Sequence, residues 1–293
     1  MYADTHAHLS HIADRGEDLA ALLRRLAEDS VPFLLDIGTK PGDLVFRRDR
    51  ILEASGGVLP SFIHFSAGLW PDGAVIADRD KAMTALNADL DLLMDEGFLP
   101  EDNRLYQALG ECGLDRYWNG PSGAERGQDG SGDGPGTLDT GGEEELFAFQ
   151  LEAARARNLP VIVHSRDAFD ATLGCIRSVG WDRGVIHCWS YGIPEARAFL
   201  DRGWHISFPG NVTWAKKNAD RERISALLRY VPRDRLLLET DAPYLTPAPH
   251  RGKTNTPHLI SHTYEAAAEY LGMSAESLAV LVAENARALF RKL

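Results

Sequence analysis

Cysteines, long apolar runs and an excess of positive charge are scarce or missing in this chain of 293 residues. Its three cysteines, Cys112, Cys175 and Cys188, have no paired spacing, which argues against a disulfide framework and favours a reducing cytoplasm. No stretch approaches the roughly 20 consecutive apolar residues of a membrane-spanning helix, and no basic region followed by an apolar stretch indicates a secretory signal. We therefore expect a cytoplasmic protein without a membrane partner, and no segment indicates an obligate protein partner.

Basic residues are outnumbered by acidic ones. The chain has 31 lysines and arginines against 43 aspartates and glutamates, which gives a formal net charge of −12. Proteins that coat nucleic acid usually carry a basic surface, because neutralising phosphates supplies much of their affinity. The composition argues against such a coat. It does not exclude a phosphate-bearing substrate, provided that bound metal ions supply local positive charge.

Short apolar runs alternate with longer amphipathic segments along the chain. Eight runs are predicted to be strands, at residues 2–5, 33–37, 61–67, 105–110, 160–163, 184–186, 204–207 and 236–240. Helical patterns lie between or after them, at residues 19–28, 81–96, 144–157, 168–178, 194–202, 219–230, 257–271 and 275–289. Eight strands with crossover helices predict an α/β fold in which a parallel sheet closes into a (β/α)8 TIM barrel.

One segment interrupts this alternation. Residues 120–142 read GPSGAERGQDGSGDGPGTLDTGG and contain almost no apolar side chains, which is typical of a loop. Because the strand–helix alternation resumes afterwards, we interpret the segment as an insertion after the fourth strand, at about residues 119–142. The sequence therefore predicts one domain over residues 1–293.

Polar side chains recur where the predicted strands end. The first strand leads into Asp4-Thr5-His6-Ala7-His8, in which alternate residues share one face. In a TIM barrel, the C-terminal ends of the strands deliver catalytic residues to a single face. The later strands end with Glu111, His164, His187, Glu239 and Asp241.

Four histidines accompanied by carboxylates predict a two-metal centre. Burying these groups together without compensation would be costly, and divalent cations remove that cost. The set exceeds the three protein ligands usual for one catalytic zinc, and suits two metals about 3.5–4 Å apart with a bridging carboxylate. We predict His6, His8 and Asp241 as ligands of one metal, His164 and His187 as ligands of the other, and Glu111 as the bridge.

The remaining roles at this centre follow from the same chemistry. Imidazole suits zinc, manganese, iron or nickel, whereas carboxylates and water suit magnesium, so Mg, Mn and Zn all stay open. Asp4 and Glu239 are predicted to lie behind the ligands and fix the histidine orientations. Two catalytic residues are predicted: Asp241, which orients the attacking water and accepts its proton as general base, and the bridging Glu111.

Eight strings match one family in order along nearly the whole chain. They are DTHAHL, ALGECGLD, PVIVHSRDA, VIHCWS, ISFPGNVTW, LLLETDAPYLTP, PHRGKTNTP and AENARALF. With them the sequence resembles the TatD-type metal-dependent deoxyribonucleases, a branch of the amidohydrolase-like barrels. The resemblance implies an amidohydrolase-like barrel that hydrolyses phosphodiester bonds in DNA with divalent metals, as an exonuclease of the 3'–5' type. It implies the same six metal ligands.

Two features depart from the pattern of this family. Members usually carry a Gly-x-His-Pro turn after the third strand, whereas the string AGLWP here places Trp70 where that histidine contacts substrate. The Gly-rich insertion is also longer than the family pattern, and its length would reshape the mouth of the site.

Two loops carry basic residues suited to a nucleic-acid strand. Arg251 and Lys253 follow the eighth strand in the family string RGK, and we predict that they hold phosphates flanking the scissile one. Lys216 and Lys217 follow the seventh strand and are either further phosphate contacts or part of a solvated loop.

Tryptophans fall in several predicted strand-to-helix loops on the face that carries the metals. Trp189, with Trp70, Trp118 and Trp214, either stacks an unpaired base or packs over the top of the barrel. Stacking by Trp189 predicts that the substrate is DNA with single-stranded ends.

Two other functions stay open. A hydrolase of the amidohydrolase-like type that acts on an amide, a lactone or another ester would use the same scaffold. Such two-metal enzymes often carry a carboxylated lysine as the bridge, and Glu111 in that place favours the nuclease branch by resemblance. A non-catalytic binding protein is disfavoured because the ligand set is complete.

Overall fold

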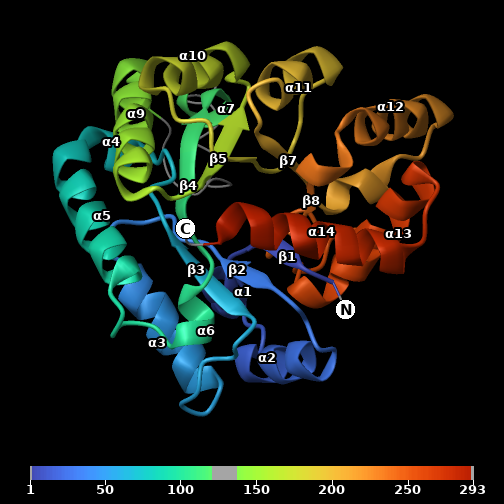
Figure 1. Cartoon of the computed structure of the whole chain (residues 1–293), viewed down its shortest axis with the longest axis horizontal. Coiled ribbons are helices and arrows are strands. Elements are labelled where there is room, and N and C mark those ends of the chain that lie inside the picture. Colours follow the sequence, from blue (N-terminus) through green and yellow to red (C-terminus); the bar gives the residue numbers. More distant parts are fainter. Residues whose placement is uncertain (1, 121–136, 292–293) are drawn as a thin grey trace.

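Eight parallel strands form the centre of the molecule in a computed structural model that describes residues 2–120 and 137–291. The strands neighbour one another in sequence order, and the last returns to the first through a bridge between Ala7 and Ala242. Helices surround this closed sheet (Figure 1), so the predicted (β/α)8 TIM barrel is confirmed. The strands are β1 (Asp4–Ala7), β2 (Leu34–Asp36), β3 (Ile63–Ala67), β4 (Gln107–Asp115), β5 (Val161–Arg166), β6 (Gly184–Ile186), β7 (His205–Phe208) and β8 (Leu236–Leu238).

All eight predicted helices are present, most of them with shifted ends. Five further helices within the described residues, α1, α3 and the short α4, α6 and α7, occupy segments for which no helix was predicted. The α-helices are α1 (Leu9–Asp14), α2 (Leu19–Glu28), α3 (Leu44–Ala54), α4 (Gly73–Ala77), α5 (Arg79–Met94), α6 (Glu101–Arg104), α7 (Arg116–Asn119), α9 (Thr140–Arg157), α10 (Phe169–Val179), α11 (Ile193–Leu200), α12 (Asn218–Tyr230), α13 (Ile260–Leu271) and α14 (Ala275–Phe290). Short 3-10 helices are η1 (Gly210–Trp214), η2 (Arg233–Arg235) and η3 (Pro257–Leu259).

The helix α2 shows how local sequence determines a barrel helix. The side chain of Asp18 accepts a hydrogen bond from the backbone N–H of Ala21 at 3.0 Å, which satisfies one of the free N–H groups at the helix start. Leu22, Leu23 and Leu26 then fall on one face, and all three are buried against the core. These two signals explain why the predicted bounds match the observed ones.

The fourth strand is longer than predicted. The expectation that it ends at Gly110 is wrong, because β4 continues through Glu111 to Asp115. Gly110 and Gly113 lie inside the strand with φ values of +147° and +139°, which glycine adopts readily. A Cβ atom at Gly113 would lie 2.0 Å from the carbonyl oxygen of His164, so glycine permits the close approach of β4 to β5.

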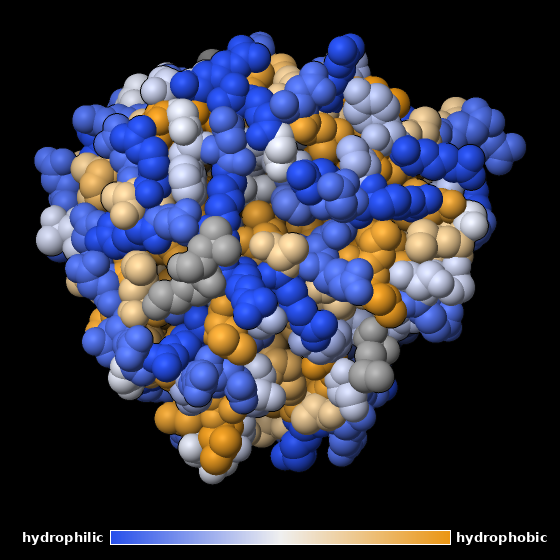
Figure 2. All heavy atoms as spheres, viewed as in Figure 1, coloured by the Kyte–Doolittle hydropathy of each residue, from blue (hydrophilic) through white to orange (hydrophobic). Residues whose placement is uncertain are grey.

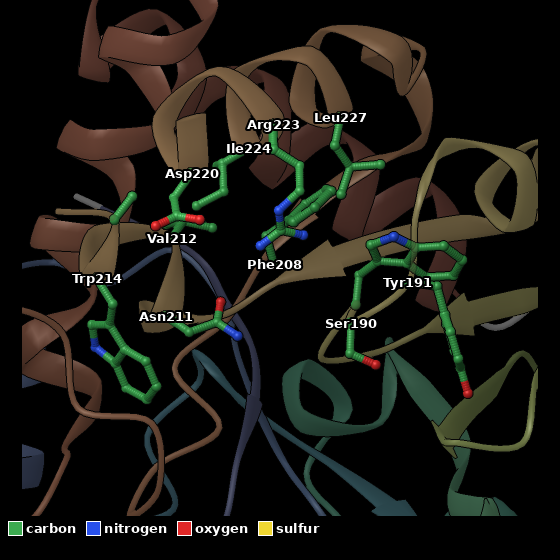
Figure 3. Close-up of a pocket in the computed structure, with 12 residues that line it drawn as sticks. Ser190, Tyr191, Phe208, Asn211, Val212, Trp214, Asp220, Arg223, Ile224 and Leu227 are labelled. Carbon is green, nitrogen blue, oxygen red and sulfur yellow. The ribbon is translucent and has the colours of Figure 1, made fainter. Parts of the chain in front are cut away.

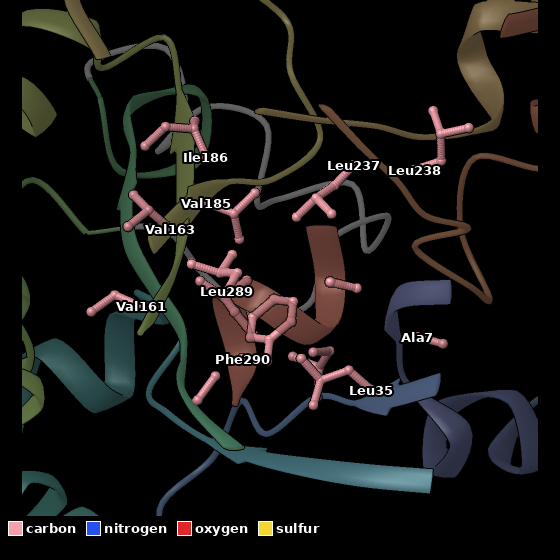
Figure 4. Packing of buried hydrophobic residues seen from close by; sticks show 14 of the residues in the cluster. Ala7, Leu35, Val161, Val163, Val185, Ile186, Leu237, Leu238, Leu289 and Phe290 are labelled. Carbon is pink, nitrogen blue, oxygen red and sulfur yellow. The ribbon is translucent and has the colours of Figure 1, made fainter. Parts of the chain in front are cut away.

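The helix α14 closes the end of the barrel at which the strands begin. Its last residues, Leu289 and Phe290, lie among Val161, Val185 and Leu35 of the strands (Figure 4). The side-chain amide of Asn285 donates to the backbone carbonyl of Leu236 at 2.9 Å, which attaches α14 to the start of β8. The opposite end of the barrel is left to carry the polar residues.

A buried ion pair supports the other end of the barrel. The guanidinium of Arg47 on α3 lies 2.5 Å from the carboxylate of Asp36 at the end of β2, and neither side chain is more than 5% exposed. Arg47 also donates to the backbone carbonyl of Ser66, while Asp36 accepts from the backbone N–H of Leu9. One arginine and one carboxylate therefore connect β2, β3 and the start of α1.

The predicted insertion falls largely on residues 121–136, which lie outside the described residues. Hydrophilic side chains dominate the face of the molecule in Figure 2, where hydrophobic ones form small scattered patches. No single helix in the described parts of the chain is long and apolar enough to cross a membrane. One bent pair within the described ranges, Pro257–Leu271 and Ala275–Phe290 at 105°, has the length and composition for a span when taken together.

Candidate metal centre

The first group of candidate ligands lies where the first and last strands meet. His6 belongs to β1, and His8 is the residue from which α1 begins. Their Nε2 atoms lie 3.2 Å apart. Each Nε2 also lies near the Oδ1 atom of Asp241, at 3.7 Å from His6 and 3.6 Å from His8. Three lone-pair donors therefore converge on one small volume.

The backbone of Asp241 has an unusual conformation that aims its side chain at the two histidines. Its φ is +54°, in the left-handed region that aspartate tolerates better than most residues. Its backbone N–H donates to the carbonyl of His6 at 2.9 Å, and the N–H of His8 donates to the carbonyl of Ala242 at 2.8 Å. These bonds place Asp241 beside the histidines although nearly the whole chain separates them in sequence.

The second group of candidate ligands comes from three neighbouring strands. The Oε1 atom of Glu111 on β4 lies 3.0 Å from Nδ1 of His164 on β5. The same oxygen lies 2.9 Å from Nε2 of His187, the residue after β6. The two histidine nitrogens are 3.3 Å apart. Glu111, His164 and His187 thus form a second compact set of donors.

The carboxylate of Glu111 connects the two groups. Its Oε1 atom faces His164 and His187, whereas its Oε2 atom lies 3.4 Å from Nε2 of His6 and 3.6 Å from Nε2 of His8. Each oxygen of one buried carboxylate therefore serves a different set of imidazoles, which is the geometry of a ligand shared between two cations.

The donor set fits divalent cations. Separations of 2.9 to 3.7 Å are those expected between atoms that each lie about 2.0–2.2 Å from one ion. Among the described residues, three groups have ligand atoms close enough to one another to share an ion. The first is His6, His8 and Asp241, and the second is Glu111, His164 and His187. A third, overlapping group is His6, His187 and Glu239. The structure thus brings all six predicted ligands together, in the two groups that the sequence suggested.

Electrostatic coupling within the centre shifts several pKa values. Burial would raise the pKa of Glu111, but His187, His164 and His6 around it hold that pKa well below the usual range. Burial lowers the pKa of His187, yet Glu111 and Glu239 outweigh it and raise the pKa well above the usual value. Burial also opposes protonation of His164, whose hydrogen bonds to Asp115 and Glu111 raise its pKa to about 9. A cation entering this group must therefore displace protons from the histidines.

Further carboxylates lie behind the histidines. The Oδ2 atom of Asp115 lies 2.8 Å from Nε2 of His164, on the side of the ring away from Glu111. Glu239 lies 3.5 Å from Nδ1 of His187 and accepts a hydrogen bond from the backbone N–H of Cys188. Such contacts fix the ring orientation and tautomer of a ligating histidine.

Asp4 contacts backbone and a hydroxyl instead of an imidazole ring. Its carboxylate accepts from the backbone N–H groups of His6 and Thr240, at 3.2 and 3.0 Å, and from the Thr240 hydroxyl at 2.6 Å. It therefore holds β1 against the segment after β8, and acts on the orientation of His6 through the backbone.

A large cavity of about 1050 Å³ opens above the two groups. Trp70 and Trp118 line it, and the ring of Trp70 lies edge-on to His164 at a centroid distance of 5.9 Å. Cationic side chains at the cavity include Lys40 and Arg166, the latter stacked over the Tyr117 ring at 3.7 Å. The cavity combines aromatic walls with positive charge around the candidate ligands.

The three predicted substrate-binding residues lie at different places around this face. Trp189 is only 4% exposed and packs edge-on against the rings of Tyr191 and Phe199. Arg251 is exposed, and its guanidinium lies 4.3 Å from the centroid of the Trp214 ring. Lys253 is exposed on the same loop. Lys216 and Lys217 are exposed after η1.

Two residues at the site were not singled out from the sequence. Asp115 lies inside the GECGLD string, and Arg166 inside HSRDA, so both were visible in the motifs. Asp115 was missed because the fourth strand was expected to end before it. Their roles become apparent only from contacts across strands, with His164 and with Tyr117 respectively.

The sequence and the structure of this chain were compared with those of known proteins. The family model of the TatD-related DNases matches residues 3–291. The chain belongs to the TatD family. A similar protein of this kind is the uncharacterized metal-dependent hydrolase YcfH of Escherichia coli, 34% identical over 295 residues, with 98% of this chain and 94% of the relative covered. The uncharacterized metal-dependent hydrolase YabD of Bacillus subtilis is 30% identical, with 99% of each chain covered.

Solved structures of TatD proteins share the barrel. The TatD homologue YjjV of Escherichia coli superposes with a TM-score of 0.75 at 24% identity, covering 99% of this chain and 97% of that one. A TatD family hydrolase of Entamoeba histolytica gives a TM-score of 0.74 at 16% identity, with 99% of both chains covered. The family assignment places the chain among the TatD-type metal-dependent hydrolases, and these structures show the same fold.

Proposed function

We propose that this TatD family member is a deoxyribonuclease that hydrolyses phosphodiester bonds with two divalent cations, removing nucleotides from single-stranded DNA ends in the 3'–5' direction. One observation carries the proposal: the two oxygens of Glu111 face separate sets of ligands, at the floor of a large cavity. A phosphodiester suits such a centre, because paired cations stabilise both the attacking and the leaving oxygen of an in-line displacement.

Different residues of the site would have different roles in the reaction. Cations held by the two groups would activate water and neutralise charge on the phosphoryl oxygens. Burial raises the pKa of Asp241, but His8, His6 and His187 outweigh it and lower that pKa, so the carboxylate is ionised at neutral pH. With one oxygen among the ligands, Asp241 orients the attacking water and accepts its proton. Asp115 holds the ring of His164 in place.

Local positive charge supports a polyanionic substrate on an acidic protein. The net charge is −12, so attraction to DNA must come from groups near the site. Lys40 and Arg166 line the cavity, and Arg251 and Lys253 are exposed on the loop after β8. These cations are suited to phosphates on either side of the scissile one.

The experiment compares substrates and metals. The purified protein is analysed for bound metal, then assayed with Mg²⁺, Mn²⁺ or Zn²⁺ on end-labelled single-stranded DNA, duplex DNA and a simple phosphodiester. We expect progressive shortening of single strands from the 3' end. Hydrolysis of an amide or a lactone, with none of these phosphodiesters cleaved, would replace the proposal by an amidohydrolase-like activity.

A matched pair of variants ties the activity to the bridge. Glu111→Gln removes the negative charge between the two groups, so we expect less bound metal and a large loss of turnover. Glu145→Gln changes an exposed carboxylate that pairs with Arg79, far from the ligands in sequence and contacts, and should behave as wild type. Equal metal content and turnover in both variants would contradict the two-cation centre.

A further inference from the structure

A second cavity of about 330 Å³ lies beside the metal centre on the same face of the barrel. We call it the side pocket. Its volume lies within the range of small-molecule sites, which is about 300–1000 Å³. Aromatic and aliphatic side chains form most of its wall. They are Tyr191 after β6, Phe208 of β7, Trp214 of η1, and Ile224 and Leu227 of α12.

Polar groups border this apolar space. The indole Nε1–H of Trp189 is buried and has no hydrogen-bond acceptor among the residues that the structure describes. Buried polar groups are nearly always hydrogen-bonded, so this donor points to an acceptor that a bound molecule would supply. Ser190, Asn211 and Arg223 also line the pocket; Ser190 and Arg223 are exposed and Asn211 is half-buried, so their side chains are accessible to a bound molecule.

Polar side chains lie on several sides of the pocket. In Figure 3, Arg223 reaches from α12 toward Phe208, with Asn211 on one side of the space beneath it and Ser190 on the other. The hydroxyl of Tyr191 is already engaged, at 2.9 Å from Ser165 Oγ, so Tyr191 offers the pocket its ring. The side pocket thus has flat apolar walls and a few convergent donors and acceptors.

The side pocket adjoins the metal centre through one loop. Ser190 lines both cavities, and it lies three residues after the candidate ligand His187. On the other side, Trp214 carries the guanidinium of Arg251 at 4.3 Å from its ring centroid. A molecule bound here would therefore contact Ser190, which also lines the cavity of the metal ligands, and Trp214, which carries a cation suited to a neighbouring phosphate.

We propose that the side pocket binds the unpaired nucleobase of the terminal nucleotide, while the phosphate of that nucleotide lies at Glu111. This inference rests on the proposed nuclease function and specifies how the substrate is held. A nucleobase has the required chemistry: a flat face for the rings of Tyr191 and Trp214, and an edge with donors and acceptors. The amide of Asn211 offers both kinds of group, and the indole of Trp189 offers a donor.

The pocket would also explain selection of a strand end. A base can enter a cavity of this kind only after it leaves its pair and its stack, which costs least at a single-stranded end. Duplex DNA with blunt ends would be a poorer substrate for this reason. The contact would tolerate any sequence, because every base has a π-face.

Binding of a nucleoside tests the pocket apart from catalysis. Deoxyadenosine carries a base and no phosphate, and deoxyribose 5-phosphate carries a phosphate and no base. We expect deoxyadenosine to bind the wild-type holoenzyme, detected by calorimetry and by a change in tryptophan emission. Ala215→Phe would place a ring in the cavity, and Arg223→Gln would remove its guanidinium, so each should weaken deoxyadenosine binding by about tenfold or more.

A matched control lies on the same helix. Arg221 of α12 pairs with Glu269 at 2.7 Å and does not line the pocket, so Arg221→Gln should bind deoxyadenosine as wild type does. Unchanged binding in Ala215→Phe and Arg223→Gln would overturn the proposal, as would the absence of deoxyadenosine binding to the wild type.

Cleavage kinetics separate this inference from the proposed function. Oligonucleotides ending in a normal or an abasic nucleotide are compared by kcat/KM. Wild type and Arg221→Gln should prefer the base-bearing end by about tenfold or more, and Ala215→Phe should lose that preference. Equal cleavage of both ends by wild type would refute the base pocket and leave the nuclease intact. Nucleoside binding without cleavage of any DNA would retain the pocket and remove the nuclease function.

Discussion

The carboxylate of Asp115 lies 2.8 Å from Nε2 of His164, while Nδ1 of the same ring faces Glu111 at 3.0 Å. Asp115 thus fixes the ring through Nε2, which leaves Nδ1 directed toward the candidate cation site. Carboxylates in this position orient the imidazole and raise its basicity as a ligand.

Asp115→Asn should weaken binding of one of two cations. An amide keeps the shape and loses the charge, so we expect about 10–100-fold lower affinity at the group of Glu111, His164 and His187. Calorimetric titration of the metal-stripped protein would resolve this loss. Asp18→Asn serves as the control, since Asp18 caps α2 and asparagine caps equally well. Two unchanged binding steps in Asp115→Asn would show that the contact has no influence on the metal.

Asp241→Asn should leave the fold intact and lower turnover by about 100-fold or more, the usual contribution of a general base. The amide keeps an oxygen among the ligands but cannot accept a proton. The check is kcat on single-stranded DNA, measured on protein with its metal content and melting temperature determined in parallel. Near-normal kcat in the metal-loaded variant would remove Asp241 from the role of base.

Much of the barrel could be predicted, because strands buried on both faces leave continuous apolar runs and their helices show clear periodicity. The six ligands could be found for a related reason: they follow such runs, where a barrel strand ends. The helix α3 was missed because its buried face includes Arg47, a charged residue that a hydrophobic pattern does not register. The side pocket was not foreseen either, since it forms from loops and α12 together.

Arg47→Met should destabilise the protein by about 3–5 kcal/mol, because it leaves the buried carboxylate of Asp36 without its cation. Urea denaturation would measure the change in the free energy of unfolding. Arg50→Met is the matched control, because Arg50 pairs with the exposed Asp14 and should change stability by about 1 kcal/mol or less. The double variant Asp36→Asn, Arg47→Met should recover part of the loss. Similar effects of Arg47→Met and Arg50→Met would contradict the role of the buried pair.

Acid should destabilise the fold through two buried histidines at other positions in the barrel. Burial lowers the pKa of His64 and of His205 from 6.5 to about 4, so both stay neutral in the folded chain where the unfolded chain takes up protons. Stability is thus complete above pH 6.5 and declines as pH falls toward 4, by up to about 1.4 kcal/mol per pH unit for each histidine.

Denaturation curves between these pH values check the prediction. The variant His64→Gln, His205→Gln should show a shallower loss of stability with acid than the wild type. Identical slopes in the two proteins would mean that other groups control the acid response.

The position of three candidate ligands at the junction between the first and last strands affects the stability of the closed barrel. His6 and His8 stand at one side of that junction and Asp241 at the other, so a cation bound by all three would link positions separated by most of the sequence. Such a cation would find all three ligands together only in the folded chain, so its binding would stabilise the folded state relative to the unfolded one. The cation proposed to take part in hydrolysis would therefore also hold the first strand against the segment after the last strand. Unfolding that starts at either end would have to release it first, so metal loading should prolong the lifetime of the folded state.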